Sequence, residues 1–327
     1  MSPQPRTSFS SPVLEFGFPS LHVGVAEYDE GPTGATVFYF PEGVMAAFDA
    51  RGGAVASFNT ERLRLGYDRP TVHAICFAGG ASFGLEACSG VLGELLARRG
   101  YSTHWTNIPT VCGAVVYDFR ARDNAVYPDK ELGRAALRAA VPGRFPLGAR
   151  GAGRFVLVGK YFGGRYAEQS GQGGAFAQTG PTKLAVFTVV NAVGVLLGRD
   201  GSVVCGNRDP ESGMRSRVVD NLRDGTAERR QRLMKTSEDG SHTTLSLVAT
   251  NQKLSYRELQ RLAIQTHTAM ARVISPFHTE SDGDVLFAVT TAEVENPSLA
   301  ADDLAVLASD LAWDAVLAGV PRTSEIG

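Results

Sequence analysis

The sequence predicts an α+β fold in which helices are layered on sheets built mainly from antiparallel strands. Short apolar segments with alternating side chains, such as 21–25 and 35–40, are separated by tight turns rich in Gly and Pro, which is typical of hairpin-connected strands. Segments 85–100 and 255–274 instead carry apolar residues at helical spacing. Because hairpin and crossover connections both occur, we expect an α+β layered sandwich and not a doubly wound parallel sheet.

The N-terminal half contains most of the expected hairpins. Turns at 30–34 and at 41–43 are each expected to connect two strands. A fully apolar strand then leads through the glycine-rich stretch 79–84 into a helix with one apolar side. The expected strands of this half are 21–25, 35–40, 44–50, 71–78 and 112–119, and the expected helices are 85–100 and 129–141.

The C-terminal half begins with a glycine-rich run at 143–180, which we expect to form loops with one strand at 155–158. Residues 208–241 carry charges of both signs and are expected to be exposed, with at most one helical segment around 226–235. A capping box of Ser255 and Glu258 opens a helix that Pro276 is expected to end. The other expected elements are strands at 183–190, 194–197, 203–204, 243–250 and 285–290 and a helix at 297–317.

Composition and charge argue against several classes of function. A formal net charge of −2 leaves no positive field to hold a nucleic-acid backbone or an anionic membrane. The 4 cysteines are far apart in the sequence, which is typical of buried thiols in a reducing compartment. The longest apolar run, 184–197, is too short to span a bilayer, and the N-terminus lacks the apolar region of a secretory signal. We therefore predict a cytoplasmic protein that binds neither nucleic acid nor membrane.

Residues 238–250 combine a polar loop with an alternating strand that begins at Thr243. A hydroxyl at the first position of a buried strand, after a long exposed loop, is the arrangement of an N-terminal nucleophile hydrolase. In such an enzyme, cleavage before the Thr frees an α-amine that serves as general base for the hydroxyl. The alternative is that Thr243 and Thr244 only open a strand, because β-branched residues favour strands.

A second candidate nucleophile is Ser82, in the sequence Gly80-Ala81-Ser82-Phe83-Gly84 between a strand and a helix. This G-x-S-x-G pattern is that of an α/β-hydrolase elbow, and Asp220 or Asp239 with His267 or His278 follow in the required order. The hairpin-like strands upstream argue against that fold. We expect Ser82 to be the N-cap of the helix instead.

A metal site is the third candidate, built from His278, Glu280, Asp282 and Asp284. Asp282 and Asp284 are two residues apart at a strand edge, so both carboxylates can point to one face, and oxygen ligands suit magnesium or calcium. The spacing matches no standard metal-binding loop, however. We expect neither a metal nor a cofactor.

The same two aspartates fit better beside Thr243. A free α-amine has an unperturbed pKa near 8 and is a poor base at neutral pH. Carboxylates orient the amine and raise that pKa, whereas a nearby lysine lowers it; Lys160 is the candidate cation, with an ordinary surface lysine as the alternative. Asn191 lies inside an apolar strand, where its amide is either an oxyanion donor or a partner in a structural hydrogen bond.

Five blocks of the sequence, in order along the chain, resemble the nylon-oligomer hydrolases. These are 6-aminohexanoate-oligomer endo-hydrolases of the N-terminal-nucleophile family that includes the β-peptidyl aminopeptidases and the L-aminopeptidase/D-esterases. The resemblance extends from about Leu21 to Leu317. The blocks are 30–37, 49–55, 73–80, 125–130 and 276–284.

The resemblance implies an αββα sandwich and a precursor that cleaves itself between His242 and Thr243. The fragments 1–242 and 243–327, formed from one domain, are expected to stay together and to assemble as a homotetramer. By position, Thr243 matches the nucleophile, Tyr117 matches a tyrosine at the substrate or oxyanion site, and the residues around the nucleophile are matched by Lys160, Asn191, Asp282 and Asp284.

One residue departs from the pattern of these relatives, which place Asn or Gly before the nucleophile where this sequence has His242. A bulkier, titratable neighbour is expected to slow processing or to make it pH-dependent.

The function that we predict is self-processing hydrolysis of internal amide bonds in linear oligoamides, including 6-aminohexanoate oligomers, by Thr243. The expected substrate is thus a small linear oligoamide or peptide. Three alternatives stay open at this point: an aminopeptidase or β-aminopeptidase of the same family, an esterase that uses Ser82, and a protein that binds without catalysis.

Overall fold

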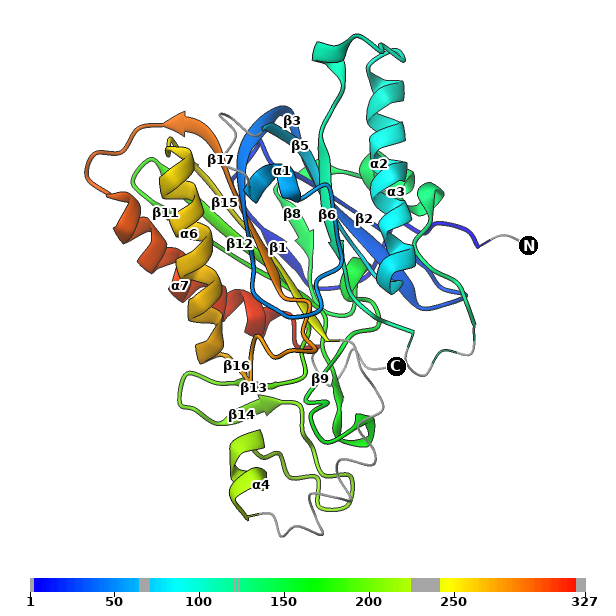
Figure 1. The fold of residues 1–327 in the computed structure, drawn as a ribbon, viewed down its shortest axis with the longest axis vertical. Coiled ribbons are helices and arrows are strands. Elements are labelled where there is room, and N and C mark those ends of the chain that lie inside the picture. The colour runs from blue at the N-terminus through cyan, green and yellow to red at the C-terminus, as the bar shows by residue number, and fades with distance from the viewer. Residues whose placement is uncertain (1–2, 65–70, 120–121, 123, 225–241, 322–327) are drawn as a thin grey trace.

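The computed structural model describes residues 3–64, 71–119, 122, 124–224 and 242–321. Most of its strands form one large sheet in the order β11-β12-β15-β17-β3-β5-β6-β4, with β2 also paired to β3 and β7 paired to β2 (Figure 1). Their bounds are β2 (His22–Tyr28), β3 (Thr33–Ala50), β4 (Ser57–Phe58), β5 (Thr71–Ala78), β6 (Val111–Val115), β7 (Val141–Pro142), β11 (Gln172–Thr179), β12 (Thr182–Asn191), β15 (Thr243–Gln252) and β17 (Val285–Val294).

The long strand β3 connects two layers of this sheet. Its first part pairs with β2 and β5, and its last part pairs with β17. Aromatic rings from the two layers meet: the ring centroids of Phe38 and Phe187 are 5.1 Å apart, and those of Phe77 and Phe287 are 6.0 Å apart. These rings lie in a large apolar core between the inner faces of the strands.

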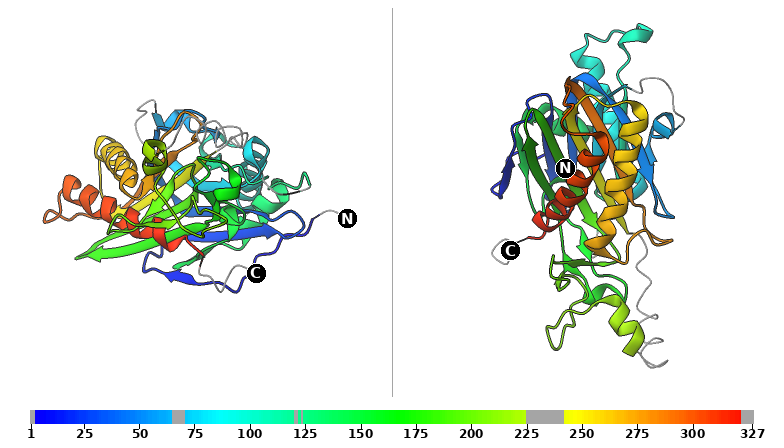
Figure 2. Two further views of the ribbon diagram at one scale, coloured as in Figure 1. Left: turned by 90° about the horizontal axis from the view of Figure 1, so that it is seen from below. Right: turned by 90° about the vertical axis from the view of Figure 1, so that its left-hand side faces the viewer.

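Helices cover the outer faces of both layers. Helices α6 (Tyr256–Ala269) and α7 (Ala301–Ala318) lie on one side, against β3, β11, β12 and β17. Helices α2 (Leu85–Arg98) and α3 (Lys130–Arg138) lie on the other side, against β2, β3, β5 and β6. Each pair buries its own apolar core against the strands, and Figure 2 shows the two pairs on opposite sides of the strands. The predicted α+β sandwich is therefore confirmed.

Short elements complete the described part of the chain. Small two- and three-stranded sheets pair β1 with β8, β9 with β10, and β13 with both β14 and β16. Their bounds are β1 (Val13–Glu15), β8 (Arg144–Pro146), β9 (Leu157–Val158), β10 (Glu168–Gln169), β13 (Val195–Leu197), β14 (Val203–Cys205) and β16 (Ile274–Ser275), and the remaining helices are α1 (Glu61–Arg64), α4 (Val218–Asp224), η1 (Ala81–Gly84), η2 (Trp105–Asn107), η3 (Gly151–Gly153), η4 (Gly164–Tyr166) and η5 (Met270–Arg272).

Two predictions about strands are wrong because glycine interrupts the alternation of side chains by which a strand is recognised. The expected turn at 41–43 is an irregularity inside β3, where the register against β5 shifts and Gly43 has a φ of 74°. Strand β11 was expected to be loop, but Gly173 and Gly174 belong to it. A Cβ on Gly173 would lie 2.0 Å from the carbonyl oxygen of Ala315 in α7, so the glycine allows this helix to pack closely on the strand.

Two predictions about helices also need correction. Ser82 is not an N-cap, because it lies within the turn η1 and the cap of α2 is Gly84, which makes no side-chain cap. The helix opened by the Ser255 capping box ends at Ala269, and Ile274 belongs to β16. The predicted helical segment at 226–235 lies outside the described residues.

No helix in the described part of the chain combines the length and the apolar character needed to cross a bilayer.

The packing of α2 on α3 provides a test of the fold. A Cβ on Gly133 would lie 2.1 Å from the carbonyl oxygen of Ala87. The change Gly133→Ala is therefore expected to push the helices apart and to lower the free energy of unfolding by about 1–3 kcal/mol.

The matched control is Gly93→Ala on α2, where the nearest atom to a new Cβ is the flexible end of Arg134 at 3.3 Å. There the better helix propensity of Ala is expected to leave stability equal or raise it by up to about 1 kcal/mol. Denaturant unfolding of both variants measures the difference, and equal stabilities would contradict the close packing.

Candidate active site around Thr243

Strand β15 begins at Thr243 and lies between β12 and β17. Thr243 is paired with Asn191 across the antiparallel β12, and the parallel β17 follows on the other side. Leu245, Leu247 and Ala249 point into the core between the layers, as the alternation predicted. Because both faces of β15 are covered, the hydroxyl of Thr243 is buried, with the residue only 4% exposed.

The carbonyl oxygen of His242 receives two hydrogen bonds. The hydroxyl Oγ1 of Thr243 donates to it over 2.5 Å, and the main-chain amide of Gly283 donates to it over 2.6 Å. The proposed nucleophile therefore lies against the peptide bond that precedes it. Sequence analysis did not single out Gly283, although its position between Asp282 and Asp284 was a signal.

Lys160 and Asn191 are joined beside the start of β15. The ammonium of Lys160 donates to the Asn191 carbonyl oxygen over 2.9 Å and to its Oδ1 over 2.8 Å. The side-chain amide Nδ2 of Asn191 donates to the carbonyl oxygen of Tyr117 over 3.0 Å. Lys160 is only 6% exposed, so it is a buried cation held by amide and carbonyl oxygens and not a surface lysine.

Tyr117 joins this group through its backbone. Its side chain is 37% exposed, and its ring centroid lies 5.9 Å from that of Phe119. The residue therefore presents a carbonyl oxygen to Asn191 and an aromatic side chain to the surface.

The two aspartates lie on the opposite side of Thr243, in the loop before β17. Asp284 Oδ1 accepts the amide hydrogen of Thr244 over 2.6 Å, which fixes the first peptide of β15. Asp282 Oδ2 accepts hydrogen bonds from the amide and the hydroxyl of Thr279, over 2.8 Å and 2.7 Å. Burial, together with the neighbouring Asp284 carboxylate, raises the pKa of Asp282 to about 6. Asp282 is thus a candidate for proton exchange near neutral pH.

Two histidines, the buried His267 and the partly buried His278, lie close to Asp284. Nδ1 of His278 is 3.0 Å from Asp284 Oδ2, and Nδ1 of His267 is 2.8 Å from Asp49 Oδ2. The two imidazole rings meet edge to face, with centroids 4.4 Å apart. His267 and His278 entered the sequence analysis only as members of rival sites, and their pairing depends on α6 packing against β3.

The rival sites are not assembled. Ser82 is exposed in η1, which contacts α2 and β6, whereas His267 lies on α6 at the other helix layer. The Asp239 that could complete that triad is outside the described residues. Within the described ranges no group of three or more His, Cys, Asp or Glu side chains has the arrangement of a metal site, and His278 and Asp284 are hydrogen-bonded to each other.

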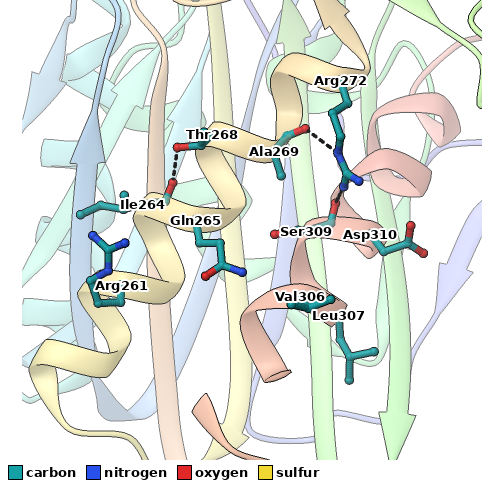
Figure 3. A pocket seen from close by; sticks show the side chains of 10 residues that line it. All are labelled: Arg261, Ile264, Gln265, Thr268, Ala269, Arg272, Val306, Leu307, Ser309 and Asp310. Carbon is teal, nitrogen blue, oxygen red and sulfur yellow. Dashed lines mark hydrogen bonds between the residues drawn. The ribbon is translucent and has the colours of Figure 1, made fainter. Parts of the chain in front are cut away.

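A separate cavity of about 850 Å³ lies between α6 and α7 (Figure 3). Its lining comes from α6, α7 and the turn η5, and it includes exposed side chains such as Val306, which is 59% exposed. The cavity thus belongs to the outer helix layer and is distinct from the cluster at the start of β15. Its lining consists of Arg261, Ile264, Gln265, Thr268, Ala269, Arg272, Val306, Leu307, Ser309 and Asp310.

Comparison with known proteins identifies the class. Over 323 residues the chain is 46% identical to a 6-aminohexanoate-oligomer endohydrolase of Agromyces sp. (strain KY5R), which covers 96% of this chain and 87% of that protein. The fold of this chain is similar to that of a Burkholderia sp. beta-aminopeptidase, with a TM-score of 0.63 and 17% identity over 92% of this chain and 84% of the other. It is also similar to the L-aminopeptidase D-Ala-esterase/amidase of Ochrobactrum anthropi, described as a variant of the Ntn hydrolase fold, with a TM-score of 0.64 and 16% identity over 96% of this chain and 88% of the other.

These similarities define an enzyme that hydrolyses amide bonds on an Ntn-hydrolase fold. The chain belongs to peptidase family S58, whose family model matches residues 18–325. The resemblance predicted from the five sequence blocks is therefore confirmed.

The burial of His267 leads to a prediction for the pH dependence of stability. Burial lowers the pKa of His267, partly opposed by the hydrogen bond to Asp49. The folded chain therefore keeps His267 neutral, while the unfolded chain binds a proton below about pH 6.5. Stability is accordingly expected to fall as the pH drops from about 6.5.

The variant His267→Asn keeps a donor for Asp49 and removes the titration, so it is expected to show a smaller loss of stability between about pH 7 and about pH 5. The control His104→Asn changes an exposed histidine and is expected to leave the dependence unchanged. Denaturant midpoints at each pH measure this, and parallel curves for parent and His267→Asn would contradict it.

Proposed function

We propose that this enzyme processes itself at the bond between His242 and Thr243 and then uses Thr243 to hydrolyse internal amide bonds of linear oligoamides. The observation that carries the proposal is the buried Thr243 hydroxyl, 2.5 Å from the carbonyl oxygen of the preceding residue. The paired Lys160 and Asn191 lie on one side of it, and the buried aspartates lie on the other. The endohydrolase with 46% identity supports 6-aminohexanoate oligomers as substrates.

Processing would begin with attack of Thr243 Oγ1 on the carbonyl carbon of His242. The bond between this carbon and the Thr243 nitrogen breaks, the hydroxyl proton passes to that nitrogen, and an ester between the His242 acyl group and Oγ1 remains. Water then hydrolyses the ester. The products are fragments 1–242 and 243–327, and the second begins with a free α-amine at Thr243.

Turnover would use this α-amine as the general base for the same hydroxyl. In this proposal Asp282 and Asp284 orient the amine, which is supported by the bond from the amide of the next residue, Thr244, to Asp284. The positive charge of Lys160, which is hydrogen-bonded to Asn191, opposes protonation of the amine. The substrate carbonyl carbon is attacked by Oγ1, the amine product leaves, and water hydrolyses the acyl-enzyme. Assembly into a homotetramer and a cytoplasmic location stay predictions from the sequence.

The nucleophile is tested by hydrolysis of linear 6-aminohexanoate oligomers. Because the whole mechanism depends on one hydroxyl, Thr243→Ala is expected to lower activity by at least about 10⁴-fold. The exposed Ser82 is the matched control, and Ser82→Ala is expected to keep the parent's activity. Loss of activity in Ser82→Ala with an active Thr243→Ala would overturn the proposal.

The type of cleavage is tested with an oligomer whose terminal amine is acetylated. An endo-hydrolase needs no free amine and is expected to cleave this substrate at a rate similar to the uncapped oligomer. Cleavage of the uncapped oligomer only, one unit at a time from the amine end, would assign the chain to aminopeptidase activity instead, as in the structurally similar beta-aminopeptidase.

A further inference from the structure

We infer that the main-chain amide of Gly283 is an oxyanion donor of this enzyme, first for cleavage before Thr243 and then for hydrolysis of the substrate. The inference rests on the proposed function, since it assigns a catalytic group to the same site. Its basis is the position of one N–H group, which donates to the carbonyl oxygen of His242 over 2.6 Å.

The sheet and the neighbouring loop hold this amide in place. His242 continues the parallel pairing of β15 with β17 by a bridge to Asp282, so the amide of Gly283 points at the His242 carbonyl. On the other side of the loop, the carbonyl oxygen of Asp282 accepts the amide of Ala54 over 2.8 Å, and that of Asp284 accepts the amide of Arg51 over 3.1 Å. The donor is therefore fixed before any reaction begins.

Attack by the Thr243 hydroxyl places negative charge on the His242 oxygen. A donor that is already aimed at this oxygen stabilises the charge without reorganisation, and in a buried site such a bond strengthens as the charge develops. The side-chain amide of Asn191, considered for this role from the sequence, donates to the Tyr117 carbonyl. The amide of Gly283, in contrast, donates to the reacting carbonyl itself.

The absence of a side chain at 283 fits this role. A Cβ there would lie 2.7 Å from Thr243 Oγ1 and 2.9 Å from the carbonyl oxygen of Ala54. These distances are shorter than ordinary contacts, so any other residue would displace the hydroxyl or the loop. Glycine thus lets the amide and the nucleophile approach the same carbonyl.

The same donor serves the substrate because both reactions pass through the same kind of intermediate, an ester on Thr243 Oγ1. Processing leaves the His242 acyl group as an ester on Thr243 Oγ1, and substrate turnover leaves the acyl part of the oligoamide as an ester on the same oxygen. Both esters are hydrolysed through a tetrahedral oxyanion at the same place. The acyl unit of the substrate therefore occupies the position that His242 occupies in the precursor.

The test removes the N–H and keeps the shape of the chain. Glycolic acid replaces Gly283 through incorporation of an α-hydroxy acid, so that an ester replaces the amide. Loss of one oxyanion donor is expected to slow the appearance of fragment 243–327 by about 10²–10³-fold. In the fraction that has been cleaved, kcat for a 6-aminohexanoate oligomer is expected to fall by a similar factor while KM stays near the parent value.

The matched control is lactic acid in place of Ala54. The ester at Gly283 also weakens the Asp282 carbonyl as an acceptor for the Ala54 amide, and the lactic acid variant removes that same hydrogen bond by its donor. Circular dichroism checks that both variants are folded. Because it keeps the Gly283 N–H, the control is expected to process much faster than the glycolic acid variant.

The outcomes distinguish a failure of the Gly283 inference from a failure of the proposed function. If the parent chain does not cleave between His242 and Thr243, the proposed function fails. If the parent cleaves and the glycolic acid variant cleaves as fast as the lactic acid control, the proposed function stands and the role of Gly283 is refuted.

Discussion

The register of β15 between its two neighbours is the constraint on which the candidate site depends. Pairing with β12 places Thr243 opposite Asn191, and pairing with β17 places His242 opposite Asp282. Because side chains alternate along a strand, a shift by one residue would turn the Thr243 hydroxyl to the other face. Leu245 and Leu247 prevent such a shift, since it would move them out of the apolar core between the layers.

The site concentrates buried polar groups at one end of this strand. Lys160, Asp282 and Asp284 are each almost completely buried, which disfavours their charged forms unless hydrogen bonds compensate. The side-chain oxygen of Asn191 accepts a hydrogen bond from Lys160, and the amide of Thr244, in the first peptide of β15, donates one to Asp284. The pKa of Asp282, raised to about 6, indicates that compensation there is incomplete. Such a group can change its protonation state near neutral pH.

Much of the fold could be predicted because local signals agreed with the tertiary structure. The alternation after Thr243, the strand 71–78 and the Ser255 capping box all appear in the structure. Strand β11 could not be found, because Gly173 and Gly174 have no side chains to show a period of two. The candidate site was reached partly through resemblance, since nothing near Lys160 in the sequence indicates that it contacts Asn191. The hydrogen bond from Gly283 to His242 and the contact between His267 and His278 depend on how loops and helices pack, and the sequence carries no signal for either.

The central claim is that Thr243 becomes a new chain start, and intact mass of the purified protein under denaturing conditions tests it directly. Measured over time, the parent is expected to yield two fragments, one that ends at His242 and one that begins at Thr243. Thr243→Ala is expected to stay a single chain. A preparation that hydrolyses oligoamides while every molecule remains uncut would contradict the account.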